Sequence, residues 1–115
     1  MILFYPELSQ RIEEMAEGDE DFRAELTKAI YDGLVELKAK YAEGLMKKDQ
    51  VIIQQVRHKL KPTLAMFDLI LLSDSLQQGK EILESEGFSQ KFGVHYRDFE
   101  VKVSSAIEEV GKMVV

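Results

Sequence analysis

The stretch QQVRHKLKPTLAMF, residues 54–67, decides the fold that we predict for this chain. At about 100° per residue, Val56, Leu60 and Thr63 fall on one side of a helix. That side continues beyond Pro62, although an interior proline costs a helix about 3 kcal/mol or more. We therefore predict a helix that runs through the proline. The expected core stripe of this helix consists of Ile52, Ile53, Val56, Leu60, Thr63, Phe67, Ile70 and Leu71.

Helical periodicity continues on both sides of this stretch, without strand-like alternation and without an internal repeat. Asp19 and Asp49 are each suited to cap a helix N-terminus. Amphipathic helices with short connections favour an antiparallel bundle. The expected fold is all-α, an antiparallel up-down four-helix bundle with a short extra N-terminal helix, as a single domain over residues 1–115. The predicted helices span about 6–17, 20–47, 50–72, 73–86 and 96–113, and the longest loop spans 86–93.

Composition excludes several classes of protein. The chain has 115 residues, of which 45% are hydrophobic and 31% charged, as in globular domains. Its net charge is −6, without the basic footprint that nucleic-acid binding requires. There is no cysteine, and the apolar start, MILFYPELSQ, is too short for a signal peptide or a membrane span. We expect a cytoplasmic monomer that binds neither nucleic acid nor membrane.

His58, within the quoted stretch, is one of only two histidines in the chain. It falls at about 200° from Val56, on the side of the helix opposite the core stripe. The imidazole should therefore face solvent or a partner. An exposed histidine is most often an ordinary polar surface residue, and this alternative stays open on geometry alone. The expected neighbours of His58 on this face are Gln54, Gln55, Lys61, Pro62 and Ala65.

Pro62 makes this surface unusual. Its ring presses on the carbonyl of the residue four positions earlier, which is His58. A kink at this point would shape the surface around the imidazole. Local strain of this kind motivates a functional hypothesis for the site.

The segment RHKLKPT, residues 57–63, resembles the signature of histidine phosphotransfer (HPt) domains, His-x-Leu-Lys-Gly-Ser/Ala/Thr. His58, Leu60, Lys61 and Thr63 match this pattern. GDEDF at 18–22 is similar to the entry of the family's second helix, and GLMKKDQVIIQQVRHKLK is similar to its approach to the histidine. The resemblance covers roughly residues 18–86 in order and spacing.

The resemblance implies a function. His58 would be the phosphoacceptor, and Lys61 would stabilise the phosphoryl group. The partner would be the receiver domain of a response regulator or hybrid sensor kinase, which supplies the aspartate and the magnesium ion. This chain has no glycine-rich phosphate loop, so it would be a phosphocarrier without kinase activity or a cofactor of its own. The expected docking surface comprises Gln54, Gln55, Pro62, Ala65 and Gln78.

The sequence also departs from the family pattern. Pro62 replaces the usual glycine, and Asp68 stands where many members have a second glycine. The glutamine that contacts the phosphoryl group in relatives would be Gln78, with Gln77 less favoured. Because Pro62 is bulkier than glycine, one alternative is a docking module that binds receiver domains or other signalling partners without phosphotransfer. An unrelated helical adaptor is a further alternative.

The remaining candidate residues favour structure over chemistry. His95 should lie at the start of the last helix and have a structural role. We expect no metal site, because no His-x-x-x-His or Glu-x-x-His pair occurs. The acidic cluster at 17–21 is typical of a helix start, since it lacks the ligand pattern of a calcium loop.

Overall fold

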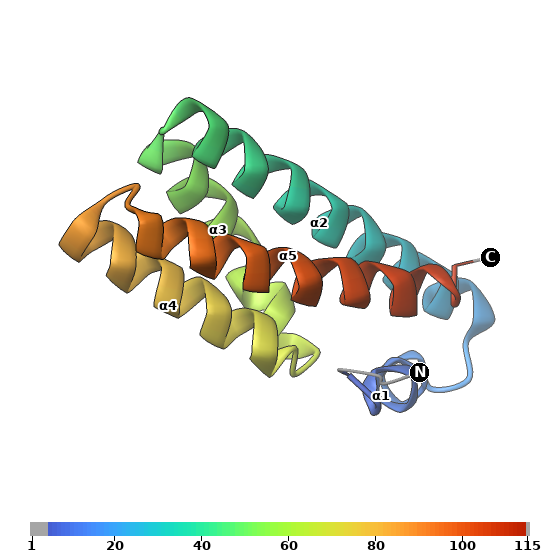
Figure 1. Ribbon diagram of the computed structural model, residues 1–115. Coiled ribbons are helices and arrows are strands. Elements are labelled where there is room, and N and C mark those ends of the chain that lie inside the picture. Colours follow the sequence, from blue (N-terminus) through green and yellow to red (C-terminus); the bar gives the residue numbers. More distant parts are fainter. Residues whose placement is uncertain (1–4, 115) are drawn as a thin grey trace.

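A computed structural model describes residues 5–114. This part of the chain is helical and contains no strand, which confirms the all-α prediction. None of its helices combines the length and the apolar character needed to cross a membrane. The helices are α1 (Leu8–Ala16), α2 (Glu20–Lys47), α3 (Gln50–Met66), α4 (Ile70–Glu86) and α5 (Gln90–Gly111) (Figure 1).

Two aspartates begin the second and third helices, as predicted. The side chain of Asp19 accepts a hydrogen bond from the backbone N–H of Phe22 at 3.0 Å. The side chain of Asp49 accepts one from the N–H of Val51 at 2.9 Å. Each bond satisfies a donor at a helix N-terminus that has no partner within the helix. These caps fix where α2 and α3 start.

The start of α5 differs from the prediction. Ser89 caps this helix by accepting a hydrogen bond from the N–H of Phe92 at 3.3 Å. The helix therefore begins at Gln90, six residues before the predicted start, and the predicted loop at 86–93 is mostly helical. His95 consequently lies inside α5 rather than at its start. Of the two glycines in this segment, only Gly87 has a positive φ, of 68°.

The end of α3 was also predicted wrongly. The helix passes through Pro62 but stops at Met66 instead of continuing to about Leu72. Asp68 adopts a left-handed φ of 52°, and the N–H of Leu69 donates to the carbonyl of Leu64 at 2.9 Å. This is the Schellman pattern of helix termination, closed here by two buried leucines.

This turn reassigns part of the expected core stripe. Ile70 and Leu71 belong to α4 and are exposed, so their assignment to the α3 core was wrong. Leu64, absent from the predicted stripe, is buried instead. The members of the stripe that are buried in the structure are Ile53, Val56, Leu60 and Phe67.

The four long helices contact one another in a cycle. α2 packs on α3, α3 on α4, α4 on α5, and α5 on α2. The buried core runs between them and contains the rings of Tyr41, Phe92 and Phe99. The short α1 packs on α2 and lies across one end of the other helices (Figure 1). This arrangement leaves one face of α3 open beside α4, where His58 lies.

Candidate functional site

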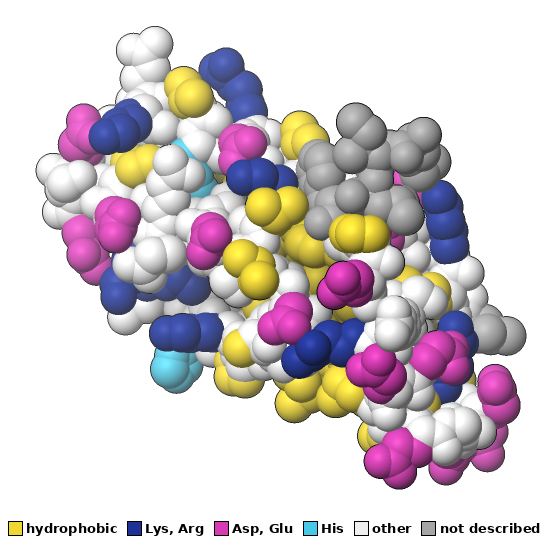
Figure 2. Space-filling model, turned by 90° about the horizontal axis from the view of Figure 1, so that it is seen from below, with side chains coloured by type: hydrophobic (Ala, Val, Ile, Leu, Met, Phe, Trp, Pro, Cys, Tyr) yellow, Lys and Arg dark blue, Asp and Glu magenta, His cyan; other side chains and the backbone are white. Residues whose placement is uncertain are grey.

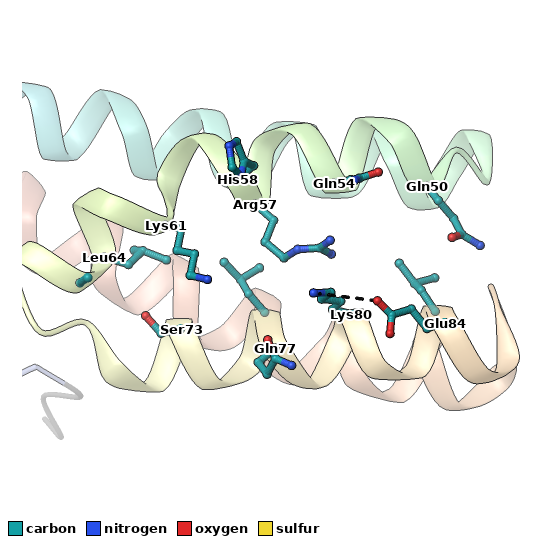
Figure 3. Close-up of a pocket in the computed structure, with 13 residues that line it drawn as sticks. Gln50, Gln54, Arg57, His58, Lys61, Leu64, Ser73, Gln77, Lys80 and Glu84 are labelled. Carbon is teal, nitrogen blue, oxygen red and sulfur yellow. Dashed lines mark ion pairs between the residues drawn. The ribbon is translucent and has the colours of Figure 1, made fainter.

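A groove of about 770 Å³ lies between α3 and α4 (Figure 3). The residues of its α3 wall lie mostly three or four positions apart in the sequence, so their side chains form one stripe along the helix. The apolar base of the groove is formed by leucines from both helices. The α3 wall consists of Gln50, Gln54, Arg57, His58, Lys61, Leu64 and Ala65. The α4 wall consists of Ser73, Leu76, Gln77, Lys80, Leu83 and Glu84.

His58 lies at the rim of this groove and is exposed, as its position on the helix indicated. In Figure 3 its ring points away from α4, whereas Arg57 and Lys61 extend from α3 toward α4. Among residues 5–114, no side chain forms an ion pair or hydrogen bond with the imidazole. The ring is therefore accessible from solvent at the centre of a helix.

The structure brings together some of the other predicted site residues. Lys61, Gln54 and Ala65 line the groove with His58. Gln55 and Pro62 are exposed on α3 but do not line it. Their positions keep them on the surface near the imidazole, outside the groove itself.

The two glutamines of α4 exchange their expected positions. Gln77 lines the groove and Gln78 does not, although the resemblance to HPt domains favoured Gln78. The side-chain amide of Gln77 donates to Glu81 at 3.4 Å. The glutamine available on the second wall of this groove is therefore Gln77.

Positive charge is concentrated in the groove. Arg57 and Lys61 from α3 and Lys80 from α4 line it, with Glu84 as the one acidic side chain of its lining. The Nζ atom of Lys80 lies 4.0 Å from Oε1 of Glu84, which is the outer limit of an ion pair. The space-filling view shows a histidine that protrudes beside basic side chains (Figure 2). Acidic side chains are spread over this face, with a dense group at its lower right.

The neighbouring Lys59 does not contribute to this charge. Its ammonium group pairs with Glu36 of α2 at 2.8 Å, on the other side of α3. Arg57 is half-buried and also lies near the core. Burial raises the pKa of the Tyr41 hydroxyl, and the charge of Arg57 acts in the opposite direction. Arg57 thus reaches the groove from a half-buried position on α3.

Sequence reasoning missed the contribution of Lys80. A signal was present, because Lys80 stands four residues after Leu76 and three before Leu83, on the same side of α4. Arg57 of α3 lines the groove as well. Their meeting across the groove depends on how α3 and α4 are aligned, which the period of one helix does not determine.

The second histidine has a structural environment. His95 is buried, and its Nε2 lies 2.8 Å from the hydroxyl of Tyr41. The rings of Phe92 and Phe99 lie against it, with centroid distances of 5.2 and 6.4 Å. Among the described residues, no cluster of three or more histidine, cysteine, aspartate or glutamate side chains is arranged to hold a metal ion.

Comparison with known proteins gives no match to a family model, a curated protein or a solved structure. The fold and the site define an all-α protein with an exposed histidine beside a basic groove. The resemblance to HPt domains therefore depends on the motif at residues 57–63 and its sequence surroundings.

Proposed function

We propose that this chain is a histidine phosphotransfer protein of a two-component phosphorelay, with His58 as the phosphoacceptor. In this proposal α2, α3, α4 and α5 form the antiparallel up-down bundle, and α1 is the extra N-terminal helix. The cyclic contacts of the four long helices support this arrangement. The match of His58, Leu60, Lys61 and Thr63 to the HPt signature supports the chemistry.

One observation carries the proposal. An exposed histidine without a partner among the described residues shares a groove with Lys61, which follows one helical turn later. Exposure lets the phosphate of a second protein reach the imidazole. The ammonium group of Lys61 can neutralise phosphoryl oxygens as a point charge. A histidine placed only for structure would not need this combination.

The proposed step is an in-line transfer. A neutral imidazole nitrogen of His58 attacks the phosphorus atom of an aspartyl phosphate on the receiver domain. The N–P bond forms while the bond between phosphorus and the aspartate oxygen breaks, and the aspartate leaves as a carboxylate. The second ring nitrogen then releases its proton to solvent. In the reverse direction, the phosphoryl group passes to another receiver, so the chain carries phosphate without consuming ATP.

The partner in this proposal is the receiver domain of a response regulator or hybrid sensor kinase. It would provide the magnesium ion for the transfer. The surface available for docking surrounds His58 and includes Gln54, Gln55, Pro62 and Ala65, with Gln77 on the α4 side. We further propose that the protein acts as a monomer in the cytoplasm.

The test is phosphotransfer from a panel of labelled, phosphorylated receiver domains to the wild-type chain and to His58→Gln. The proposal requires acid-labile label on the wild-type protein and none on the variant. Lys61→Gln should slow transfer by about tenfold or more, since a charge-assisted hydrogen bond contributes about 1.5–3 kcal/mol. Lys48→Gln, which changes an exposed lysine outside the groove, serves as the matched charge control. Label that persists on His58→Gln would refute His58 as the acceptor.

Pro62 favours a second candidate, a docking module that binds receivers or other signalling partners without chemistry. Proline stands exposed one turn after His58, where the family has a small glycine. The two candidates differ in one measurable respect. The docking module predicts equal receiver binding by wild type and His58→Gln, without transferred label on either. A carrier predicts transfer that depends on His58.

A further inference from the structure

Three cationic side chains enter the groove from two helices. Arg57 and Lys61 extend from α3, and Lys80 faces them from α4 (Figure 3). Their charges lie on the groove side of α3, whereas the ring of His58 points away from α4. Arg57 and Lys80 therefore form a cationic centre apart from the imidazole, whereas Lys61 is the residue proposed to act with His58.

Most of this charge is not balanced by the protein. Arg57 and Lys61 form no ion pair with any residue in the described part of the chain, although Lys59 beside them pairs with Glu36. Lys80 has only Glu84, at the 4.0 Å limit. The whole chain carries a net charge of −6, so unpaired cations gathered in one groove are not a consequence of composition. Like charges that face one another across a groove favour a bound anion.

The groove also has an apolar side. Leu64, Leu76 and Leu83 line it between the charged groups and are otherwise buried in the core. Its volume of about 770 Å³ falls in the range of small-molecule sites, about 300–1,000 Å³. Apolar walls with a few polar groups are typical of such sites. A suitable ligand would combine an anionic group with an apolar ring or chain.

We infer that the groove between α3 and α4 binds a small organic phosphomonoester. The phosphate contacts Arg57 and Lys80, and the apolar part of the ligand lies against the groove wall beside Leu76 and Leu83. Arginine offers a paired set of donors to phosphate oxygens, and lysine adds a point charge. This site does not depend on phosphotransfer through His58.

A small ligand fits the groove better than an acidic peptide. In Figure 3 the side chain of Arg57 extends toward Lys80, while the ammonium group of Lys61 lies apart from them. Glu84, which also lines the groove, would repel acidic residues of a peptide. The other polar groups of the lining are the neutral amides of Gln50, Gln54 and Gln77, the hydroxyl of Ser73 and the imidazole of His58. This pattern suits one phosphate group with a mostly uncharged remainder.

The test is isothermal titration calorimetry of the unphosphorylated full chain with phenyl phosphate and with inorganic phosphate. Phenyl phosphate should bind more tightly than inorganic phosphate, because only its ring can pack against the apolar part of the groove wall. Arg57→Gln and Lys80→Gln should each weaken binding by about tenfold or more, as expected when a charged hydrogen bond is lost. Arg97→Gln removes another arginine without an ion pair among the described residues and should have no effect. Circular dichroism confirms that the variants fold.

Several outcomes would overturn the inference. One is the absence of phenyl phosphate binding at millimolar concentration, and another is an equal loss of affinity in Arg97→Gln. Binding of an acidic peptide with no binding of phenyl phosphate would assign the groove to a protein partner. Loss of phenyl phosphate binding in His58→Gln would make the cations part of the phosphohistidine site. Retained binding in that variant, together with failed phosphotransfer in the receiver assay, would leave this site standing while the proposed function falls.

Discussion

The hydroxyl of Tyr41 on α2 and Nε2 of His95 on α5 lie 2.8 Å apart in the core, and Gly79 of α4 closes over both. A Cβ atom at Gly79 would collide with the hydroxyl and with the imidazole. Three helices therefore meet at one polar pair that admits only a glycine.

The buried imidazole should make stability depend on pH. Burial lowers the pKa of His95 below its ordinary value; Asp98 acts in the opposite direction, and Lys102 adds to the lowering. The unfolded chain therefore binds a proton more readily than the folded chain. The contribution is complete above about pH 6.5, the ordinary histidine pKa, and is lost as the pH falls toward the lower folded pKa. Urea unfolding between pH 7.5 and 5.5 should show a decreasing free energy of unfolding.

Two variants assign this effect to a residue. His95→Gln should flatten the decrease over this pH range, even if its stability is lower at every pH. His58→Gln is the matched histidine control on the surface and should retain the decrease. An unchanged slope in His95→Gln would show that other groups cause the pH dependence.

Gly79→Ala should destabilise the protein. The added methyl group must displace Tyr41 or His95, and overpacking of a core costs about 1–3 kcal/mol. The higher helix propensity of alanine recovers at most about 1 kcal/mol. Urea denaturation measures the difference. Gly93→Ala is the control, because a methyl group added there would meet no neighbouring atom within 4 Å and alanine should stabilise α5. A neutral or stabilising Gly79→Ala would contradict the close packing of the three helices.

Local sequence signals predicted much of the fold because they act within one helical turn. Asp19 and Asp49 accept hydrogen bonds from N–H groups two or three residues later, so the starts of α2 and α3 could be predicted. Ser89 is an equally local cap for α5, but Gly87 and Gly93 around it suggested a loop. Gly93 lies inside the helix. The prediction therefore missed the hydrogen bond between the side chain of Ser89 and the N–H of Phe92, three residues later.

The end of α3 depends on contacts that a local pattern does not contain. Arg11 of α1 donates from Nε to the carbonyl of Met66 at 2.9 Å, and it pairs with Asp68 at 2.7 Å. These contacts join segments that are 55 residues apart. Helical periodicity continues through this turn in the sequence, so the prediction continued α3 to about Leu72.

The candidate site, too, could be predicted only in part from local sequence signals. The exposure of His58 follows from the angle between residues of one helix, and the sequence predicted it. The opposition of Arg57 and Lys80 depends on the turn between α3 and α4, whose position was predicted wrongly. The choice of Gln78 over Gln77 came from the resemblance to HPt domains, and the helix period alone did not determine which of the two faces α3.

Substitutions at Asp68 should separate backbone strain from charge. Asp68 holds a left-handed φ of 52° and an exposed ion pair with Arg11. Asp68→Ala loses the pair and keeps an unfavourable backbone, so we expect destabilisation of about 1–2 kcal/mol. Asp68→Gly also loses the pair but relieves the backbone, and it should lie within about 1 kcal/mol of wild type. Thermal or urea unfolding checks the order. If alanine were as stable as glycine at this position, the left-handed conformation would not be costly.

Replacement of Pro62 should stabilise the protein and test its effect on transfer. Proline has no N–H, so the carbonyl of His58 lacks the donor that a helix normally supplies four residues later. Pro62→Ala restores this donor and should raise the free energy of unfolding by about 2–3 kcal/mol. Alanine is about 3 kcal/mol more favourable than proline inside a helix, and the greater freedom of the unfolded chain offsets about 0.4–1 kcal/mol of this gain. Pro62→Gly should gain about 1 kcal/mol less than alanine.

The same two variants distinguish the two proposed functions. If the bulk of proline hinders approach to His58, Pro62→Gly should accelerate phosphotransfer from a receiver more than Pro62→Ala, although it is the less stable of the two. A rate that follows stability instead would show that proline acts through the helix backbone. Tight receiver binding without transfer in all three proteins would favour the docking module, because the family's own glycine would then fail to restore the chemistry.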